Sequence, residues 1–250
     1  MPLVLGITGS IATGKSLLCE QLVTQHGAVH GDADKLVHRM YDPGKPGFDR
    51  IVAEFSDEIV GEDGLIDRKI LGGMVFGKPE RMGALTKAIG DIEAEMKQTI
   101  ERWREELGDE DISILEVVNL IEAGYSAWTD ATWLVAADDE VALSRLMKRN
   151  AFSHEEAQQR LASARSWKER EPASDRVFLN NGTAEEFVEA IEQAIEETQR
   201  QLREGTLPRS RFHQWWEDTK DEREARQEEM RRRREEAEAK RAGEAQTEAD

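Results

Sequence analysis

The chain has 250 residues, which is enough for one α/β domain with an insertion or for a domain with a smaller appendage. Its formal net charge at pH 7 is −18, and residues 205–250 contribute only −2 of it, so residues 1–204 carry −16. This acidic body disfavours a nucleic-acid partner, because neutralising phosphates requires a basic surface.

Cysteine content and the start of the chain indicate the compartment. Cys19 is the only cysteine, which excludes an internal disulfide and a cysteine-rich zinc site and favours a reducing environment. The apolar residues 1–6 lack a preceding basic segment, and glycines interrupt them long before they could span a membrane. We therefore expect a cytoplasmic protein without a membrane anchor.

The first predicted elements are a strand, a loop and a helix. Residues 4–8 form a short apolar run ended by glycine, which is typical of a buried parallel strand, and residues 15–26 carry leucines at helical spacing. A second strand is predicted at 28–31 and a helix at 35–41, which ends at the proline- and glycine-rich turn 42–47.

The middle of the chain is predicted to be helical, since residues 48–107 show no strand-like alternation. Helices are expected at 48–55, 68–76, 79–103, 139–149, 154–168 and 184–203, and further strands at 112–118, 132–136 and 176–179. About five apolar strands separated by helices indicate an α/β protein with a doubly wound parallel sheet, into which 48–107 is inserted as a helical subdomain. Insertions of this kind usually lie at the carboxyl ends of the strands, where ligands bind.

Residues 205–250 form a charged C-terminal tail, distinct from the domain at 1–204. We expect a solvated, fraying helix or disorder, with helical ion pairs such as Glu228 with Arg232. The cluster of Phe212, Trp215 and Trp216 could dock the tail on the body or bind a protein partner.

Residues 9–16 read Gly-Ser-Ile-Ala-Thr-Gly-Lys-Ser and match G-x-x-x-x-G-K-[ST], the pattern of a phosphate-binding P-loop. In such a loop backbone N–H groups surround the phosphates, the lysine neutralises them and the serine coordinates Mg²⁺. The sequence therefore predicts a P-loop NTPase fold that binds ATP and Mg²⁺, with Ser16 as the metal ligand. The predicted ATP contacts are Gly9, Ile11, Ala12, Thr13, Gly14, Lys15, Ser16 and Leu17.

Two carboxylates follow the second predicted strand, at the same edge of the sheet as the loop. Asp32 is the candidate catalytic base for an acceptor hydroxyl, acting with Lys15 on the phosphates. Asp34 could contact the substrate, or it could simply cap the following helix.

The other candidate polar residues carry less specific signals. Cys19 is expected in the core, although the nearby helix N-terminus could lower its pKa. His26, His30, His154 and His213 have no metal-ligand spacing, so surface or helix-end roles are expected for them.

The chain resembles the dephospho-CoA kinase family over residues 3–195. The resemblance lies in the order and spacing of the segments 6–16, 31–39, 63–68, 75–76, 120–124 and 145–149, together with Arg160, Asp175 and 180–182. It implies transfer of the γ-phosphoryl group of ATP to the ribose 3′-hydroxyl of dephospho-CoA, the last step of CoA synthesis. It also implies that Asp32 is the base, that 48–107 holds the acceptor and that a mobile lid lies at about 150–172.

The developing charge on the transferring group must be offset by cations. Arg145, Arg149 and Arg160 are candidates near the lid, with Arg149 assigned to ATP and Arg160 to the substrate, although each could be a solvated helix residue. Arg68 could meet an acceptor phosphate.

Several positions depart from the common family pattern: Ala12, His38, Gly90-Asp91, Asn119, Asn150 and Ala164. They leave two alternatives open. One is a kinase of another small hydroxyl acceptor, such as a nucleoside or nucleotide. The other is an ATP-binding regulatory protein with reduced catalysis.

Overall fold

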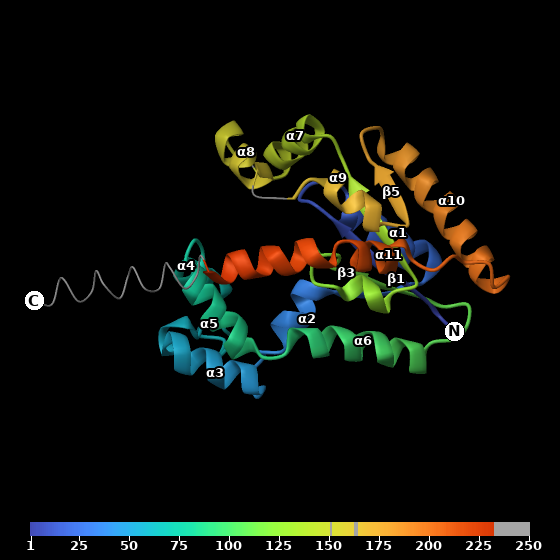
Figure 1. Ribbon diagram of the computed structural model, residues 1–250. Helices are drawn as coiled ribbons and strands as arrows, with labels where there is room; N and C mark the ends of the chain where they lie inside the picture. Colours follow the sequence, from blue (N-terminus) through green and yellow to red (C-terminus); the bar gives the residue numbers. More distant parts are fainter. Residues whose placement is uncertain (151, 163–164, 233–250) are drawn as a thin grey trace, which may run out of the picture.

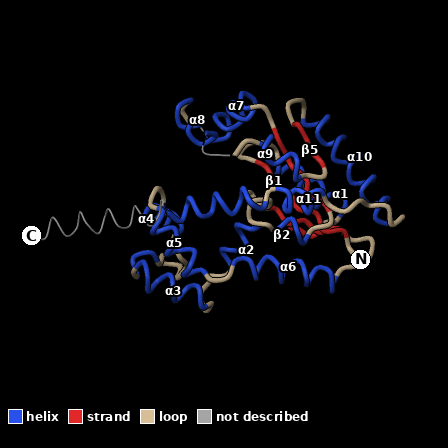
Figure 2. Tube along the Cα trace, viewed as in Figure 1, coloured by secondary structure: helices blue, strands red, loops and turns tan. Residues whose placement is uncertain are grey.

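Five short apolar runs form one parallel sheet (Figure 2), and the computed structural model describes residues 1–150, 152–162 and 165–232. The strands are β1 (Leu3–Gly9), β2 (Val29–Asp32), β3 (Ile112–Glu116), β4 (Ala131–Ala136) and β5 (Arg176–Leu179). Their order is β2-β3-β1-β4-β5, all pairings are parallel, and β1 lies at the centre, buried along its whole length. The predicted α/β fold with about five parallel strands is confirmed.

Helices cover both faces of the sheet (Figure 1). On one face α1 (Lys15–His26) and α10 (Ala184–Arg203) bury apolar side chains against the strands. On the other face α2 (Ala33–Arg39) and α6 (Ile92–Glu106) do the same, with Trp103 in the cluster. Burial from both sides explains why the strands read as continuous apolar runs. Within the described part of the chain, no helix has the length and apolar character needed to cross a membrane.

The predicted insertion forms a helical subdomain with its own core. α3 (Pro46–Phe55), η1 (Asp57–Ile59), α4 (Arg68–Val75) and α5 (Pro79–Ile89) surround an apolar cluster that is separate from those on the sheet. In Figure 1 these helices lie together beyond the carboxyl end of the sheet. The subdomain is thus placed where an acceptor could meet the phosphate loop.

One long helix over 79–103 was predicted, and this is wrong. The chain breaks after α5 at Gly90, whose φ is 116°, and α6 begins after Asp91. The Asp91 carboxylate accepts a hydrogen bond from the backbone N–H of Ala94 at 2.9 Å and so caps α6. Two of the departures from the family pattern therefore serve to end one helix and start the next.

The lid region also contains more helices than the pattern indicated. α7 (Asp139–Asn150) is followed by α8 (His154–Ala162) and by the short α9 (Trp167–Arg170). The predicted single helix over 154–168 is wrong, because a new helix starts after Ser166, whose hydroxyl accepts a hydrogen bond from the N–H of Lys168 at 3.3 Å. The departure at Ala164 lies outside the described residues.

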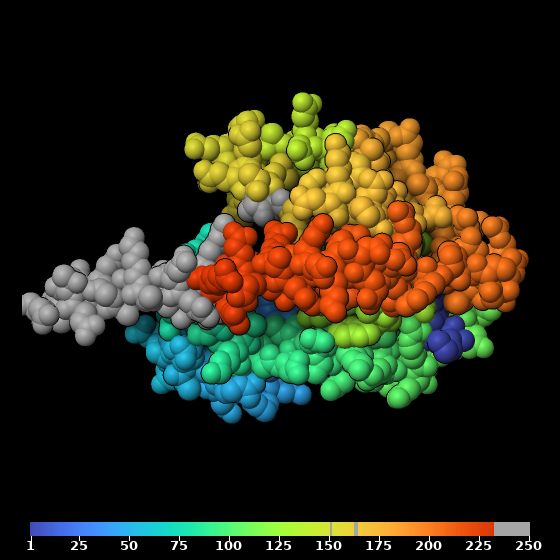
Figure 3. Space-filling view, viewed as in Figure 1, coloured from blue at the N-terminus to red at the C-terminus, as the bar shows by residue number. Residues whose placement is uncertain are grey.

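The C-terminal tail is helical as far as it is described. α11 (Arg211–Asp218) is followed by a further helix over 220–232, which we call the tail helix. The predicted ion pair between Glu228 and Arg232 is present at 3.2 Å, whereas residues 233–250 lie outside the described residues. Figure 3 shows the tail lying across the body, between the inserted subdomain and the lid.

Aromatic residues attach the tail to the body. Phe212 is only 1% exposed and packs in a cluster with Ile121 and Ala173, against which Trp215 and Trp216 also lie. Of the two roles expected for this aromatic cluster, docking on the body is the one observed.

Asp175 fixes the point where the tail meets the sheet. Its carboxylate accepts hydrogen bonds from the Ser210 hydroxyl at 2.6 Å and from the N–H of Arg211 at 2.7 Å. It also accepts one from the N–H of Thr132 at 2.6 Å, at the start of β4. One carboxylate therefore joins the beginning of α11 to the sheet.

Phe212→Ala should release the tail from the body. Phenylalanine-to-alanine changes in cores cost about 3–5 kcal/mol, which exceeds what the exposed ion pairs of the tail can supply. Amide hydrogen exchange should become fast in α11 and remain slow in the sheet. Phe76→Ala is the matched control, because Phe76 is 80% exposed. Unchanged exchange in α11 would show that other contacts hold the tail.

Candidate active site

The phosphate loop connects β1 to α1, and its two glycines are required by close contacts. A side chain at Gly9 would collide with the carbonyl oxygen of Val135, and one at Gly14 would collide with the amide of Asn180. Gly14 also has a φ of 109°, which disfavours L residues with a side chain. Ala12 adopts a left-handed φ of 61°, a conformation that costs about 1 kcal/mol in alanine and explains the frequent glycine there.

Polar contacts hold the loop in shape. The side-chain amide of Asn180 donates to the carbonyl oxygen of Thr13 at 2.9 Å, and the Thr13 hydroxyl donates to the carbonyl oxygen of Ser10 at 3.0 Å. Lys15 Nζ donates to the same Ser10 oxygen at 3.0 Å. Burial lowers the pKa of Lys15, and the negative charge of Glu116 partly opposes this shift. The ammonium group is therefore held in a poorly solvated site, where its attraction to an anion is strong.

A cavity of about 750 Å³ opens over the loop, a volume within the range of nucleotide-sized ligand sites. It is lined by Ile11, Ala12, Thr13, Gly14, Lys15, Ser16, Val118, Arg145, Lys148 and Arg149. Arg149 thus lines the same cavity as Lys15, and its role toward ATP stays a prediction. Arg145 lies there too, with its guanidinium group donating to the carbonyl oxygen of Asn180 at 2.8 Å.

Leu17 and Arg160 are placed differently from the other predicted contacts. The Leu17 side chain packs against the core cluster on the α1 face of the sheet. The Arg160 guanidinium lies 4.5 Å from the ring centroid of Phe152, within the lid. Neither side chain lines the cavity over the loop.

Asp32 lies at the carboxyl end of β2 and caps α2. Its Oδ1 accepts hydrogen bonds from the N–H groups of Asp34 at 3.0 Å and Lys35 at 3.3 Å. The capping role considered for Asp34 therefore belongs to Asp32, and Asp34 is an exposed residue in the first turn. Asp32 Oδ2 lies 3.3 Å from Lys35 Nζ, an exposed ammonium that can move away. One carboxylate oxygen is thus used structurally, while the other is available for chemistry.

Arg68 lines a second cavity, of about 690 Å³, at the inserted subdomain. The guanidinium Nη1 donates to Nδ1 of His38 at 2.7 Å, so His38 accepts as a neutral imidazole. Burial lowers the pKa of His38, and the charge of Arg68 lowers it further. His38, which departs from the family pattern, therefore orients Arg68 without adding a negative charge. Among the described residues no carboxylate forms an ion pair with Arg68, although Asp42, Glu62, Asp63 and Asp67 line the same cavity.

Glu116 is a candidate site residue that sequence reasoning missed. It ends β3, the strand between β1 and β2, and the register places it opposite Asp32. A hydrogen bond from His30 lowers its pKa, burial raises it, Lys15 lowers it and Asp32 raises it. The signal that could have identified Glu116 is its position at the end of a strand beside the loop. The predicted strand covered 112–118, so the carboxylate was assigned to the strand interior.

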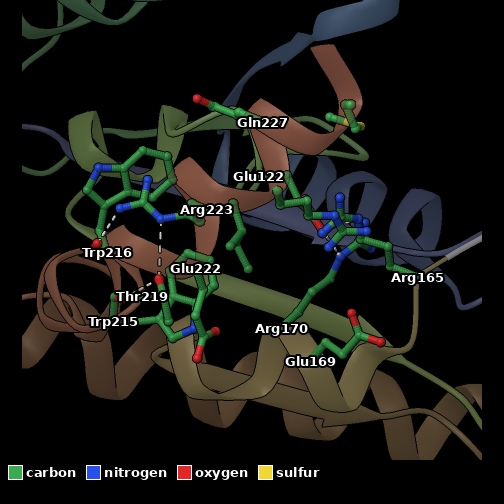
Figure 4. Close-up of a pocket in the computed structure, with 13 residues that line it drawn as sticks. Glu122, Arg165, Glu169, Arg170, Trp215, Trp216, Thr219, Glu222, Arg223 and Gln227 are labelled. Atoms are coloured by element: carbon green, nitrogen blue, oxygen red, sulfur yellow. Dashed lines mark hydrogen bonds and ion pairs between the residues drawn. The ribbon is translucent and has the colours of Figure 1, made fainter. Parts of the chain in front are cut away.

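A second missed group lies at the base of the predicted lid, where Figure 4 shows Arg165 and Arg170 beside Glu122. Arg170 is 5% exposed, and its Nε lies 2.8 Å from a carboxylate oxygen of Glu122. Arg165 lies 3.7 Å from the same carboxylate, and its carbonyl oxygen accepts a hydrogen bond from the Ser10 hydroxyl at 3.2 Å. These contacts connect the lid with the loop that would bind phosphate.

The tail forms the other side of this region. A cavity of about 450 Å³ lies between the base of the lid and the tail helix. Figure 4 shows Arg223 over the ring of Trp216, and its guanidinium carbon is 3.4 Å from the ring centroid. The tail is therefore packed beside the lid, although it is remote from the loop in the sequence.

The chain is similar to known dephospho-CoA kinases over most of its length. The family model described as dephospho-CoA kinase matches residues 3–186. A dephospho-CoA kinase of Symbiobacterium thermophilum is 36% identical over 192 residues, which cover 76% of this chain and 79% of that protein. One from Streptococcus pneumoniae is 33% identical over 194 residues, covering 77% of this chain and 94% of that protein.

Solved structures agree with the sequence comparisons. A dephospho-CoA kinase from Campylobacter jejuni has a TM-score of 0.56 and 25% identity, with coverage of 78% of this chain and 96% of that one. The protein TT1252 from Thermus thermophilus has a TM-score of 0.62 and 28% identity, with coverage of 78% and 97%. The phosphate loop, the parallel sheet and these comparisons lead to one conclusion, that the chain belongs to the dephospho-CoA kinase family.

Proposed function

We propose that the protein transfers the γ-phosphoryl group of ATP to the ribose 3′-hydroxyl of dephospho-CoA, giving CoA and ADP in the cytoplasm. The observation that carries this proposal is the arrangement at the sheet edge. The phosphate loop follows β1, Asp32 ends β2, and Glu116 ends the strand between them. The charge of Lys15 lowers the pKa of Glu116, and the charge of Asp32 raises it. A phosphate-binding lysine and a candidate base therefore face one carboxylate, and the family relationship identifies the acceptor.

In the proposed reaction, the loop amides and Lys15 bind the β- and γ-phosphates of ATP. Asp32 Oδ2, once Lys35 has moved away, accepts the proton of the 3′-hydroxyl while the hydroxyl oxygen forms its bond to the γ-phosphorus. The bond from the γ-phosphorus to the bridging oxygen breaks, and ADP leaves. Arg149, which shares the cavity with Lys15, would offset charge that develops on the transferring group.

The residues present suit a magnesium ion. Mg²⁺ prefers oxygen ligands, and the loop edge offers the exposed Ser16 hydroxyl together with the carboxylates of Asp32 and Glu116. We assign Ser16 as the direct ligand and the Asp32 carboxylate as the group that holds bound water. When present, the ion supplies charge neutralisation at the β- and γ-phosphates.

Acceptor binding is proposed at the inserted subdomain. Arg68 lines its cavity and is held by a neutral histidine, so its charge remains available to an acceptor phosphate. Asp34, exposed at the start of α2, and Arg160, in the lid, are proposed as further acceptor contacts. The acidic body leads us to expect no nucleic-acid partner.

An ADP-release assay with alternative acceptors tests the proposal. ADP formation should depend on dephospho-CoA and should be far slower with nucleosides or nucleoside monophosphates at equal concentration. Preference for one of those compounds would identify a different acceptor. ATP binding without turnover on any acceptor would favour a regulatory protein, for which the docked tail residues would have to release and bind a partner.

A further inference from the structure

Three potential metal ligands from separate elements meet beneath the phosphate loop. They are Cys19 in α1, His30 in β2 and Glu116 at the end of β3, and one ligand atom of each lies within 4.8 Å of the other two. The strand register explains the meeting, because His30 is paired with Ile114 and Asp32 with Glu116. His30 and Glu116 are thus diagonal neighbours on the face of the sheet that α1 covers.

The three groups already lie close together. His30 Nε2 lies 3.0 Å from Glu116 Oε2, and the Cys19 Sγ lies within 4.8 Å of the ligand atoms of both residues, where burial and the Glu116 carboxylate raise the thiol pKa. Cys19 is 1% exposed, while the side chains of His30 and Glu116 are 24% and 16% exposed. The cluster is therefore shielded by protein but keeps a route to solvent on the imidazole side.

We propose that Cys19, His30 and Glu116 form a binding site for a thiophilic divalent cation of the zinc type. Sulfur, imidazole and carboxylate are the ligands that zinc takes in proteins. Bond lengths of about 2.0–2.3 Å in a tetrahedral site place ligand atoms roughly 3.3–3.8 Å apart, so only small side-chain rotations are needed. Water can supply the fourth ligand from the exposed side.

The electrostatic surroundings suit a cation. Burial raises the pKa of the Cys19 thiol, and the charges of Glu116 and Asp32 raise it further, while Lys15 acts in the opposite direction. A bound divalent cation would displace the thiol proton to solvent and compensate both the thiolate and the Glu116 carboxylate. Cation binding would therefore place a compensating positive charge beside two negative ligands.

The second histidine–carboxylate pair of this face provides a matched control. His26 lies in α1, as Cys19 does, and its Nε2 is 2.8 Å from a carboxylate oxygen of Glu192, but within the described ranges no thiol lies close enough to that pair to complete a three-ligand cluster. A cation that needs only histidine and carboxylate would bind both pairs. A cation held by the thiol should select the pair at His30.

The test is the zinc content of the full chain. The protein is treated with a chelator, incubated with zinc alone and passed through gel filtration before its bound metal is measured. One equivalent of zinc is expected in the wild type and in His26→Ala. Binding should be at least about 100-fold weaker in Cys19→Ala and His30→Ala, since loss of an outer-shell partner alone costs about 10–100-fold. Equal binding in Cys19→Ala and wild type, or equal loss in His26→Ala, would overturn the proposal.

Cobalt(II) gives a second readout that needs no variant. A sulfur-to-cobalt charge-transfer band should appear in the wild type on addition of one equivalent, because Cys19 is the only cysteine. Absence of this band would also overturn the proposal. Neither measurement uses turnover, so its failure would leave the proposed kinase activity untouched, and failure of the kinase assay would leave the metal site untouched.

Discussion

Asp32→Asn is expected to lower kcat for dephospho-CoA phosphorylation by about 10²–10⁴-fold, the usual contribution of a positioned general base. Asparagine keeps the carbonyl oxygen that accepts from Asp34 and Lys35 and is itself a favoured N-cap residue. The helix start, and hence stability, should be preserved while the proton acceptor is lost. Steady-state kinetics together with the thermal unfolding midpoint measure the two effects separately.

Asp34→Asn is the matched control for this variant. Asp34 is exposed in the first turn of α2 and has no capping role, so as a proposed acceptor contact its change should act on KM for dephospho-CoA and leave kcat within about tenfold of the wild type. The proposed base would be wrong if Asp32→Asn kept most of its kcat. It would be reassigned if Asp34→Asn showed the larger loss.

Lys15→Met is expected to lower kcat by about 10²–10³-fold and to weaken ATP binding, since it removes a cation aimed at the transferring group. Methionine fills nearly the same volume and removes an ammonium whose pKa burial already lowers, so the loop should remain folded. Turnover and nucleotide titration on the same preparation measure the loss.

Lys97→Met controls for the general effect of removing a lysine charge. Lys97 lies on α6 with its side chain 56% exposed, 3.9 Å from Glu101, and takes no part in either cavity. Its kinetics should match the wild type. ATP affinity and turnover that survive in Lys15→Met would contradict the assignment of the loop as the phosphate site.

Much of the fold could be predicted from periodicity and turn residues. The bounds of α1, β5 and α10 agree with the prediction. Each element either ends near a glycine or has an apolar spacing that differs from the spacing in the adjoining segments. The strand predicted at 112–118 ends at Glu116 and the helix predicted at 35–41 spans Ala33–Arg39, but the larger errors occurred where helical segments follow one another directly. At Gly90 and at Ser166 local capping ended or started a helix within a stretch whose apolar spacing continued.

The residues of the candidate site also fall into two groups, those that the sequence predicted and those that it did not. Lys15 and Asp32 were predicted because a loop motif and a strand end are local features of the sequence. Glu116 and Asn180 were not included, since their roles depend on which strands are neighbours. A strand order in which β3 separates β1 from β2 is a property of the whole sheet.

By itself, the sequence determined the phosphate loop and the alternation of strands and helices. Both depend on backbone conformation and on the spacing of buried apolar residues, which neighbouring residues set. Tertiary structure alone decided which face the tail covers, how Arg68 is oriented by His38 and where His30 lies relative to Cys19. The histidines looked scattered in the sequence, yet parallel pairing of distant strands places one of them beside the only thiol. Contacts of this kind depend on the order and register of the strands, which residue spacing does not encode.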